Sequence, residues 1–485
     1  MGKKINLKAL VDKGSNKVIF VESGDTFIDV VLSFLTIPLG IIIMLGREYS
    51  AQVKIGCMNN LYLSVEKFNQ GELLSDACRK MLLLPPNAAE SHCKNLVFQI
   101  DHNAKPTRYF GCSRFLKQTT RKLFRYSPGT TLCRACGFNT SGKITFYVDV
   151  PSAFVKKQTM LLISDNLKLI FPDSKSFIPL CTQLKVKRTK TLDLSIGVEE
   201  VINILTSSLI SKTPLTETLL KHKPVAKLSN ENNYQATHID PQTVGETVLT
   251  EEDPQTVGET AVLTEEDPQT VGETAVQTEE DPQTVGETVL TEEDNISIKL
   301  IISKSQNFVC YAEAGADFVN LLFSFLTLPL GFVAKQIQDG SLKGCIDQLY
   351  RSVQDLDAQH LKSNHHKEML VNPKVAPGFC YNSPLGIEEA SYYYLNGKPT
   401  TDSSLFSSTG FLEGPTSFTV TDNLVITPLS APLQVSILGK LHVPFTDTEE
   451  RVVLMGKKEA LSLLVASFDS DSALTNAFVS KPYQA

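Results

Sequence analysis

The pattern of apolar and polar positions predicts a β-hairpin followed by a helix near the amino terminus. Apolar residues alternate over 7–11 and recur over 17–21, and the polar stretch DKGSN between them favours a turn. Asp25 or Thr26 can then cap a helix. Four apolar residues follow at the spacing that places them on one helical face: Phe27, Val30, Val31 and Phe34.

The same pattern recurs in the second half, which identifies the chain as a tandem duplication. Residues 5–40 and 296–331 align without a gap and share the ending SFLT-x-PLG. Pro38 ends or kinks the first helix, because proline lacks an amide donor and crowds the preceding turn. We interpret the shared ending as a packed helix exit; a binding loop is the functional alternative.

Further matched segments indicate an α+β fold. A second helix is predicted over 58–68 and has a counterpart after Gly344, and each copy closes with a helix, after Ile196 and after Met455. Strands mixed with a few helices, without regular βαβ alternation, favour two homologous α+β units. Each unit is expected to be a β-hairpin followed by helices and further strands.

A different repeat separates the copies. Four near-identical units of the type DPQTVGETVLTEE begin at Asp240, Asp253, Asp267 and Asp281. A short unit with so few aliphatic residues cannot bury enough surface to offset chain entropy, so we expect an acidic, disordered linker. The linker has a functional interpretation as well: it docks a basic partner, or it folds back onto the first copy as a weak internal competitor.

These patterns divide the chain into three parts. The first unit is expected over 1–230, with a cysteine-rich insert near 93–137. The linker follows over 231–294, and the second unit, over 295–485, lacks the CxxC pair of the first.

Charge is segregated along the chain, whose net charge is -7. Residues 1–239 carry 32 basic and 18 acidic residues, residues 240–294 carry 17 acidic and no basic residues, and residues 295–485 carry 14 basic and 18 acidic residues. This asymmetry bears on association rather than on fold.

No membrane span and no secretory signal are expected. The longest apolar run, 30–45, is interrupted by Pro38 and by polar residues, whereas a span needs about 20 apolar residues. Without an export signal, the ten cysteines are reduced thiols or metal ligands rather than a disulfide framework. We therefore expect a cytoplasmic or nuclear protein.

One group of cysteines has a spacing that suits metal binding. Cys133 and Cys136 form a CxxC turn followed by glycine, which can present two thiolates to a structural zinc ion, and Cys112 is the third candidate ligand. Candidates for a fourth ligand are Cys93, His92 and His102. Accidental or vestigial cysteines and a redox pair are the alternatives to zinc.

Basic residues surround and follow these cysteines. These residues are typical of a solvated loop and an exposed strand end, and with Phe115, Phe124 and Tyr126 interleaved a nucleic-acid surface is the functional alternative. The basic residues are Arg114, Lys117, Arg121, Lys122, Arg125, Lys185, Lys187, Arg188 and Lys190.

No catalytic motif is present in the sequence. It contains no GxSxG, Walker, GxGxxG or HExxH pattern in a fitting context. The adjacent histidines His365 and His366 lie in a polar stretch and are expected to be exposed.

The residues quoted above resemble a plant family called domain of unknown function 674. The SFLT-x-PLG ending, the helix around Tyr62 and the closing segment after Ile196 carry the resemblance, which covers nearly the whole chain outside the linker. The family is similar in its cysteine-rich insert, which Tyr109–Cys112 and Cys133–Gly137 match. Leu116 and Lys117 stand where the family has a further cysteine. The resemblance implies a plant source and no activity.

Together these observations favour a non-enzymatic interaction or regulatory module with a candidate structural zinc site in the first copy. Its expected partner is a protein. A nucleic-acid-binding protein, through the basic first copy, and an enzyme with a site between the copies are the alternatives.

Overall fold

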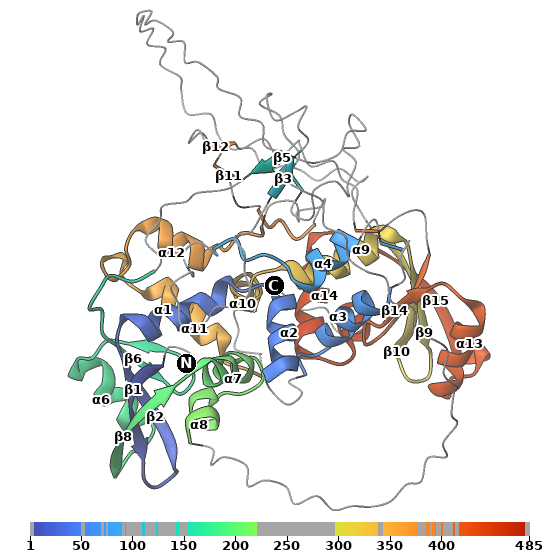
Figure 1. Ribbon diagram of the computed structural model, residues 1–485. Coiled ribbons are helices and arrows are strands. Elements are labelled where there is room, and N and C mark those ends of the chain that lie inside the picture. Colours follow the sequence, from blue (N-terminus) through green and yellow to red (C-terminus); the bar gives the residue numbers. More distant parts are fainter. Residues whose placement is uncertain are drawn as a thin grey trace, which may run out of the picture. The chain divides into compact units, whose positions relative to one another are not determined.

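The computed structural model describes most of both copies. The described ranges are 4–49, 54–68, 76–89, 154–220, 296–337, 343–376, 384–388 and 417–480, with several pieces of one to three residues between them. The fold is α+β, as the sequence predicts, and each copy contributes one five-stranded antiparallel sheet (Figure 1). The acidic repeats lie outside the described residues, and the domain boundaries stay predictions.

The two sheets have equivalent strand orders. Sheet 1 has the order β7-β6-β2-β1-β8, and its strands are β1 Ile5–Asp12, β2 Lys17–Ser23, β6 Leu161–Ser164, β7 Leu169–Ile170 and β8 Thr189–Ile196. Sheet 2 has the order β14-β13-β10-β9-β15, and its strands are β9 Ile296–Ser303, β10 Phe308–Ala314, β13 Phe418–Thr421, β14 Ile426–Pro428 and β15 Thr448–Met455. The predicted hairpin is confirmed in both copies as β1–β2 and β9–β10. Short strands outside the two sheets are β3 Tyr109–Gly111, β4 Leu123–Phe124, β5 Gly142–Ile144, β11 Tyr392–Tyr393 and β12 Pro399–Thr400.

The helices also correspond between copies. Those of the first copy are α1 Asp25–Ser33, η1 Phe34–Thr36, α2 Leu39–Tyr49, α3 Met58–Lys67, α4 Asp76–Leu83, α6 Ser174–Gln183, α7 Val198–Ser208 and α8 Pro214–Leu219. Those of the second are α9 Ala316–Ser324, η3 Phe325–Thr327, α10 Leu330–Gln336, α11 Ile346–Asp355, η4 Ala358–His360, α12 Asn364–Val371, α13 Ala431–Lys440, η6 Phe445–Asp447, α14 Lys457–Asp469 and α15 Ala473–Phe478. The helices predicted after Gly24, over 58–68 and at the end of each copy are therefore confirmed.

The two copies meet at the motif they share. Pro38 and Pro329 lie opposite each other in an isolated antiparallel bridge. The residue after each proline donates its amide to the carbonyl of the residue before the other proline, at 2.9 Å in both cases: Leu39 to Leu328 and Leu330 to Ile37. The prolines thus occupy the pair of positions whose own amides make no hydrogen bond in such a bridge, and their missing N–H is not needed.

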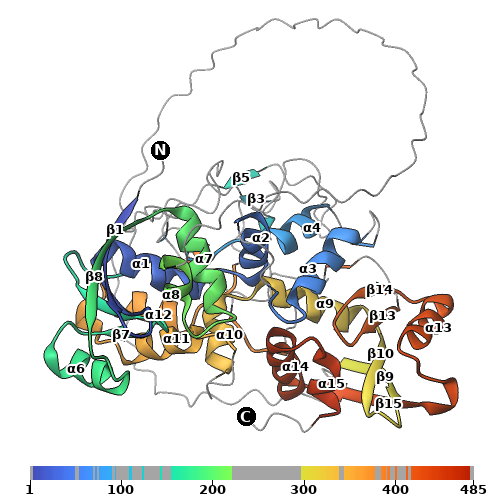
Figure 2. The ribbon, with the colours of Figure 1, turned by 90° about the horizontal axis from the view of Figure 1, so that it is seen from below.

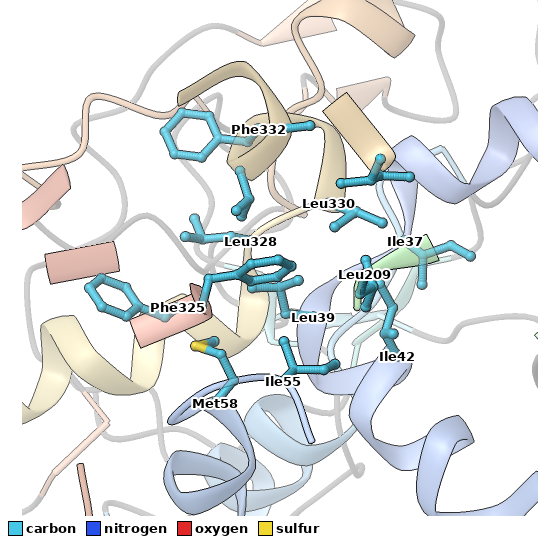
Figure 3. Packing of buried hydrophobic residues seen from close by; sticks show 14 of the residues in the cluster. Ile37, Leu39, Ile42, Ile55, Met58, Leu209, Phe325, Leu328, Leu330 and Phe332 are labelled. Atoms are coloured by element: carbon cyan, nitrogen blue, oxygen red, sulfur yellow. The ribbon is translucent and has the colours of Figure 1, made fainter. Parts of the chain in front are cut away.

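Apolar side chains surround this bridge. Ile37, Leu39, Leu328 and Leu330 are each at most 1% exposed, and Figure 3 shows them packed with Met58, Leu209 and Phe325. Burying a side chain of this size stabilises a fold by about 1.5–3 kcal/mol. One continuous hydrophobic cluster therefore runs through both copies. The helix exit is packed, as its sequence suggests, and its packing partner is the equivalent exit of the other copy.

Each copy also places helices against the sheet of the other. Helix α3 of the first copy lies against α9 and β14 of the second, whereas α11 of the second copy lies against β7 of the first. In Figures 1 and 2, the blue α3 is accordingly found beside sheet 2 and the orange α11 beside sheet 1. The exchange is reciprocal, like the interface of a two-fold symmetric dimer formed within one chain.

Matched hydrogen bonds fix the exchanged helices. The amide of Ile426 in β14 donates to Ser64 Oγ of α3 at 3.0 Å, and the amide of Leu169 in β7 donates to Ser352 Oγ of α11 at 3.1 Å. Both serines are buried. Because each strand amide lies next to a helix of the other copy, neither sheet has its full set of hydrogen bonds without that copy.

The turns that lead into these helices approach the other copy very closely. The amide of Cys57 donates to the carbonyl of Ser467 at 2.8 Å, and the amide of Cys345 donates to the carbonyl of Ser208 at 2.7 Å. A Cβ atom on the preceding glycine, Gly56 or Gly344, would lie 2.5 Å or 2.3 Å from the same carbonyl oxygen. These two positions need glycine because backbone of the other copy fills the space.

We therefore expect Gly344→Ala to lower the free energy of unfolding by about 2 kcal/mol or more, because an added methyl group overlaps backbone that cannot move freely. Denaturant unfolding of the full chain measures this loss. Gly439→Ala in α13 is the matched control, since nothing lies within 4 Å of its added Cβ, and it should change stability by less than about 1 kcal/mol. Equal effects of the two substitutions would contradict the close approach.

Candidate docking surface

The candidate zinc ligands cannot be placed. Cys112, Cys133 and Cys136 lie outside the described residues, and so do His92 and His102. Cys93 is described: it is half-buried against the core, and its Sγ lies 4.0 Å from Thr36 Oγ1. Within the described ranges, His, Cys, Asp and Glu nowhere form a group of three or more that could hold a metal ion.

The buried carboxylate of Asp29 anchors backbone. Its Oδ1 accepts hydrogen bonds from the amides of Phe154 at 2.7 Å and Val155 at 2.9 Å. Burial raises the pKa of Asp29 to about 6, although these two amides oppose the shift. In the second copy Asn320 Oδ1 accepts the equivalent bond from the Phe411 amide at 2.7 Å. Because the neutral amide of Asn320 makes this bond in the second copy, we interpret the Asp29 carboxylate of the first copy as structural.

Asp165 connects α8 to the hairpin of sheet 1. Its carboxylate accepts from the Thr216 amide at 2.8 Å and from Thr216 Oγ1 at 2.6 Å, and this Oγ1 accepts from the Val18 amide at 2.8 Å. Burial raises the pKa of Asp165. Asp422 and Thr475 repeat the arrangement in the second copy. Repetition in both copies marks a structural clamp rather than a catalytic pair.

The expectation that both adjacent histidines are exposed is wrong for His366. Its side chain is buried in α12, and its Nδ1 lies 2.7 Å from Ser363 Oγ. Burial lowers the pKa of His366. Although the stretch is mostly polar, the side of α12 that carries His366 packs against Phe154 of the first copy. The centroids of the two rings are 6.5 Å apart.

An open depression lies on the outer face of sheet 1. Its volume is about 590 Å³, and its polar lining comes from β1, β2 and β8: Asn6, Lys8, Glu22, Asp193 and Ser195. Lys8 is opposite Glu22 on one side and Asp193 on the other. The depression does not enclose a ligand or exclude water, which small-molecule sites generally do.

Six cationic side chains gather at the hairpin end of sheet 1. The turn between β1 and β2 lies beside the segment that leads into β8, because the Lys13 amide donates to the Arg188 carbonyl at 2.8 Å. Asp12 at the end of β1 is opposite Lys17 on one side and Thr189 on the other. We call this cluster the basic end, and it consists of Lys13, Lys17, Lys185, Lys187, Arg188 and Lys190.

The charges of the basic end are available to a partner. All six side chains except Lys190 are exposed, and Lys190 Nζ lies 3.3 Å from Asn16 Oδ1. Across the described part of the chain, none of the six is in a salt bridge. The nearby Asp12 accepts two bonds from Ser15, and these hold its pKa below the ordinary value. Asp165 lies near the cluster as well, since the charge of Lys17 opposes the rise in its pKa, and two carboxylates still leave an excess of positive charge.

The equivalent end of sheet 2 has the same backbone and different charges. The Lys304 amide donates to the Asp447 carbonyl at 2.8 Å, as Lys13 donates to Arg188. Asp447 accepts from the hydroxyls of Ser303 and Ser305 at 2.7 and 2.8 Å. Glu449, which corresponds to Lys190, pairs with Arg451 at 2.7 Å. The fold therefore does not require the cations of the basic end.

Like charges gathered at one end of a sheet repel one another, which destabilises the compact state. A cluster that the fold does not need, and that is kept at this cost, creates a positive potential that attracts anionic partners. The sequence pointed to Lys185, Lys187, Arg188 and Lys190. It missed Lys13 and Lys17, which the predicted hairpin turn brings to the same edge.

The fold and this surface define a class: an α+β protein in which two duplicated copies exchange helices and differ in the charge at their hairpin ends. The chain belongs to the family described as protein of unknown function (DUF674), whose model matches it twice, over residues 2–253 and 246–458. No curated protein and no solved structure matches this chain.

The raised pKa of Asp29 predicts how stability depends on pH. A carboxyl group whose folded pKa is about 6 against an ordinary 3.8 stabilises the fold fully only below pH 4, and this contribution is lost as pH rises through 6. Asp29→Asn should therefore raise the free energy of unfolding above pH 6, by up to about 3 kcal/mol, and have little effect at pH 4.

Denaturant unfolding between pH 4 and 8 measures this difference, with Asp193→Asn on the exposed face as the control for loss of one charge. A gain for Asp29→Asn that is independent of pH would show that the carboxyl group does not titrate in this way.

Proposed function

We propose that this chain is a non-enzymatic interaction module that docks an acidic segment of a partner protein at the basic end of its first copy. The observation that carries the proposal is the contrast between two matched backbones. Six cations cluster at one hairpin end, whereas Asp447 and Glu449 occupy the equivalent end of the other sheet. Lys17 and Lys190 lie in β2 and β8, and the other four cations lie in the turn and the segment that border these strands.

The chemistry of the basic end favours carboxylates over nucleic acid. Five of its six cations are lysines, compact point charges that pair with carboxylate and phosphate alike, so the distinction rests on groups that would contact bases. Segments 12–17 and 185–190 contain no aromatic side chain on which a base could stack. The aromatic residues that suggested nucleic-acid binding, Phe115, Phe124 and Tyr126, lie outside the described residues.

An enzyme with a site between the copies has weaker support. The described interface around Pro38 and Pro329 is filled with apolar side chains (Figure 3), and its hydrogen bonds are structural.

Among the described helices, none combines the length and the apolar character of a membrane span. The free thiols of Cys57, Cys310 and Cys345 are buried, which supports a reducing compartment, the cytosol or the nucleus, as the place of action.

The binding test uses a fluorescent polyglutamate 20-mer and the full chain at low salt. Anisotropy should show binding that weakens steeply as salt is added, because exposed charge pairs are screened. Lys187→Glu/Arg188→Glu should weaken binding at least tenfold. Lys156→Glu/Lys157→Glu is the matched control, since these lysines are exposed near the opposite end of sheet 1, and it should change binding less than twofold.

A single-stranded oligonucleotide of equal charge tests the alternative. Binding of the oligonucleotide at least tenfold tighter than polyglutamate would favour a nucleic-acid partner. Equal losses in both double variants would mean that the probe responds to total charge and not to the basic end.

A structural zinc ion in the first copy is a separate proposal, which rests on the spacing of Cys112, Cys133 and Cys136 alone. Metal analysis of the full chain, purified reduced, should find about one zinc per molecule, and Cys133→Ser/Cys136→Ser should abolish it. No zinc in the unaltered chain would identify these cysteines as remnants.

A further inference from the structure

The chain leaves the first copy beside the basic end. Helix α8, the last described element before the acidic repeats, is tied to the hairpin through Thr216, whose Oγ1 accepts from the amide of Val18, the neighbour of Lys17. Figure 1 shows α8 next to β2. The described residues of the first copy end at residue 220, four residues after Thr216. The exit point is therefore fixed close to the cationic cluster.

The segment that follows has the charge that this cluster lacks. Residues 240–294 contain 17 carboxylates and no basic residue, and each of the four repeat units carries four of the carboxylates. Residues 221–239 separate the exit point from the first unit. A chain of this length spans at most about 65 Å when fully extended, so the first unit can reach the basic end.

We propose that the acidic repeats of this chain occupy the basic end of the same molecule and compete there with the acidic partner. This inference rests on the proposed function and names its regulation. A tethered segment has an effective concentration in the millimolar range, so weak charge pairs give substantial occupancy. Four near-identical units offer the site several equivalent ligands, and a partner must displace whichever unit is bound.

The second copy supports this assignment by contrast. There Asp447 and Glu449 stand where the first copy has Arg188 and Lys190. Their carboxylates are already bonded, to Ser303 and Ser305 and to Arg451. The repeats carry no cation that could bind there. Of the two equivalent hairpin ends, only that of the first copy complements the repeats.

Carbodiimide coupling detects the contact in the full chain. The reagent activates a carboxyl group, and a lysine Nζ within reach then forms an amide bond with it. Mass spectrometry should find links from residues 240–294 to Lys185, Lys187 and Lys190. These links should fall at least fivefold between 50 mM and 500 mM salt, and the links to Lys185 and Lys190 should fall as much in Lys187→Glu/Arg188→Glu. Links to Lys156 and Lys157 should be rare under all conditions.

Competition is measured with a neutral-linker variant, in which all 17 acidic residues of 240–294 are changed to the corresponding amides. This variant keeps the length of the linker and leaves every described residue of the two copies unchanged. At low salt it should bind the polyglutamate probe about tenfold more tightly than the unaltered chain, and the two affinities should converge as salt rises. Adding Lys187→Glu/Arg188→Glu to it should abolish the gain.

The outcomes separate the inference from the function on which it rests. If both chains bind the probe at the basic end with equal affinity and no links form, the inference is overturned and the proposed function stands. If neither chain binds the probe although the links form, the repeats occupy the site and the proposed acidic partner is wrong. Links spread evenly over all exposed lysines would overturn the inference as well.

Discussion

The antiparallel pairing of the two prolines, Pro38 and Pro329, is the contact on which the rest of the fold depends. It brings the two helix exits together at a pair of positions where proline loses no hydrogen bond. From there α2 and α10 start in fixed directions, and the turns before α3 and α11 cross to the other copy. Leu39 and Leu330, the residues that follow the two prolines, are buried at this pairing.

Duplication within one chain has consequences for both stability and function. The matched contacts at Ser64 and Ser352, and at Cys57 and Cys345, mean that neither copy completes its own core. Packing therefore constrains both copies together, although some buried positions differ in chemical type, as Asp29 and Asn320 do. At the hairpin ends, the backbone bond from Lys13 to Arg188 is kept as Lys304 to Asp447, while the charges have diverged.

Much of the architecture follows from local pattern. The alternation in β1 and β2, the helical spacing from Phe27 to Phe34 and the repeat itself predict the α+β fold and its duplication. The exchange of helices cannot be predicted in this way. Helical periodicity indicates that Leu61 and Leu349 are buried, but it does not indicate which copy they pack against. SFLT-x-PLG could be interpreted as a packed exit, but its partner, a second copy of itself, appears only in three dimensions.

The candidate surface, too, can be predicted only in part, because local sequence shows some of its residues and tertiary contacts add the others. Lys185, Lys187, Arg188 and Lys190 lie within six residues of one another, so the sequence alone identifies a basic stretch. Lys13, in the hairpin turn, and Lys17, at the start of β2, lie more than a hundred residues earlier, and only the antiparallel pairing of β1 with β8 adds them to the cluster. The clamp from Asp165 through Thr216 to Val18, which places the linker exit beside this cluster, likewise depends on tertiary contacts.

Cutting the chain between its copies tests most directly whether they form one body. A protease site inserted between residues 230 and 240 allows cleavage after folding, without altering either copy. The shared core predicts that the two halves remain together on size exclusion at micromolar concentration and unfold in a single cooperative transition. Two separate, folded halves that elute as independent monomers would contradict the exchange of helices and the account built on it.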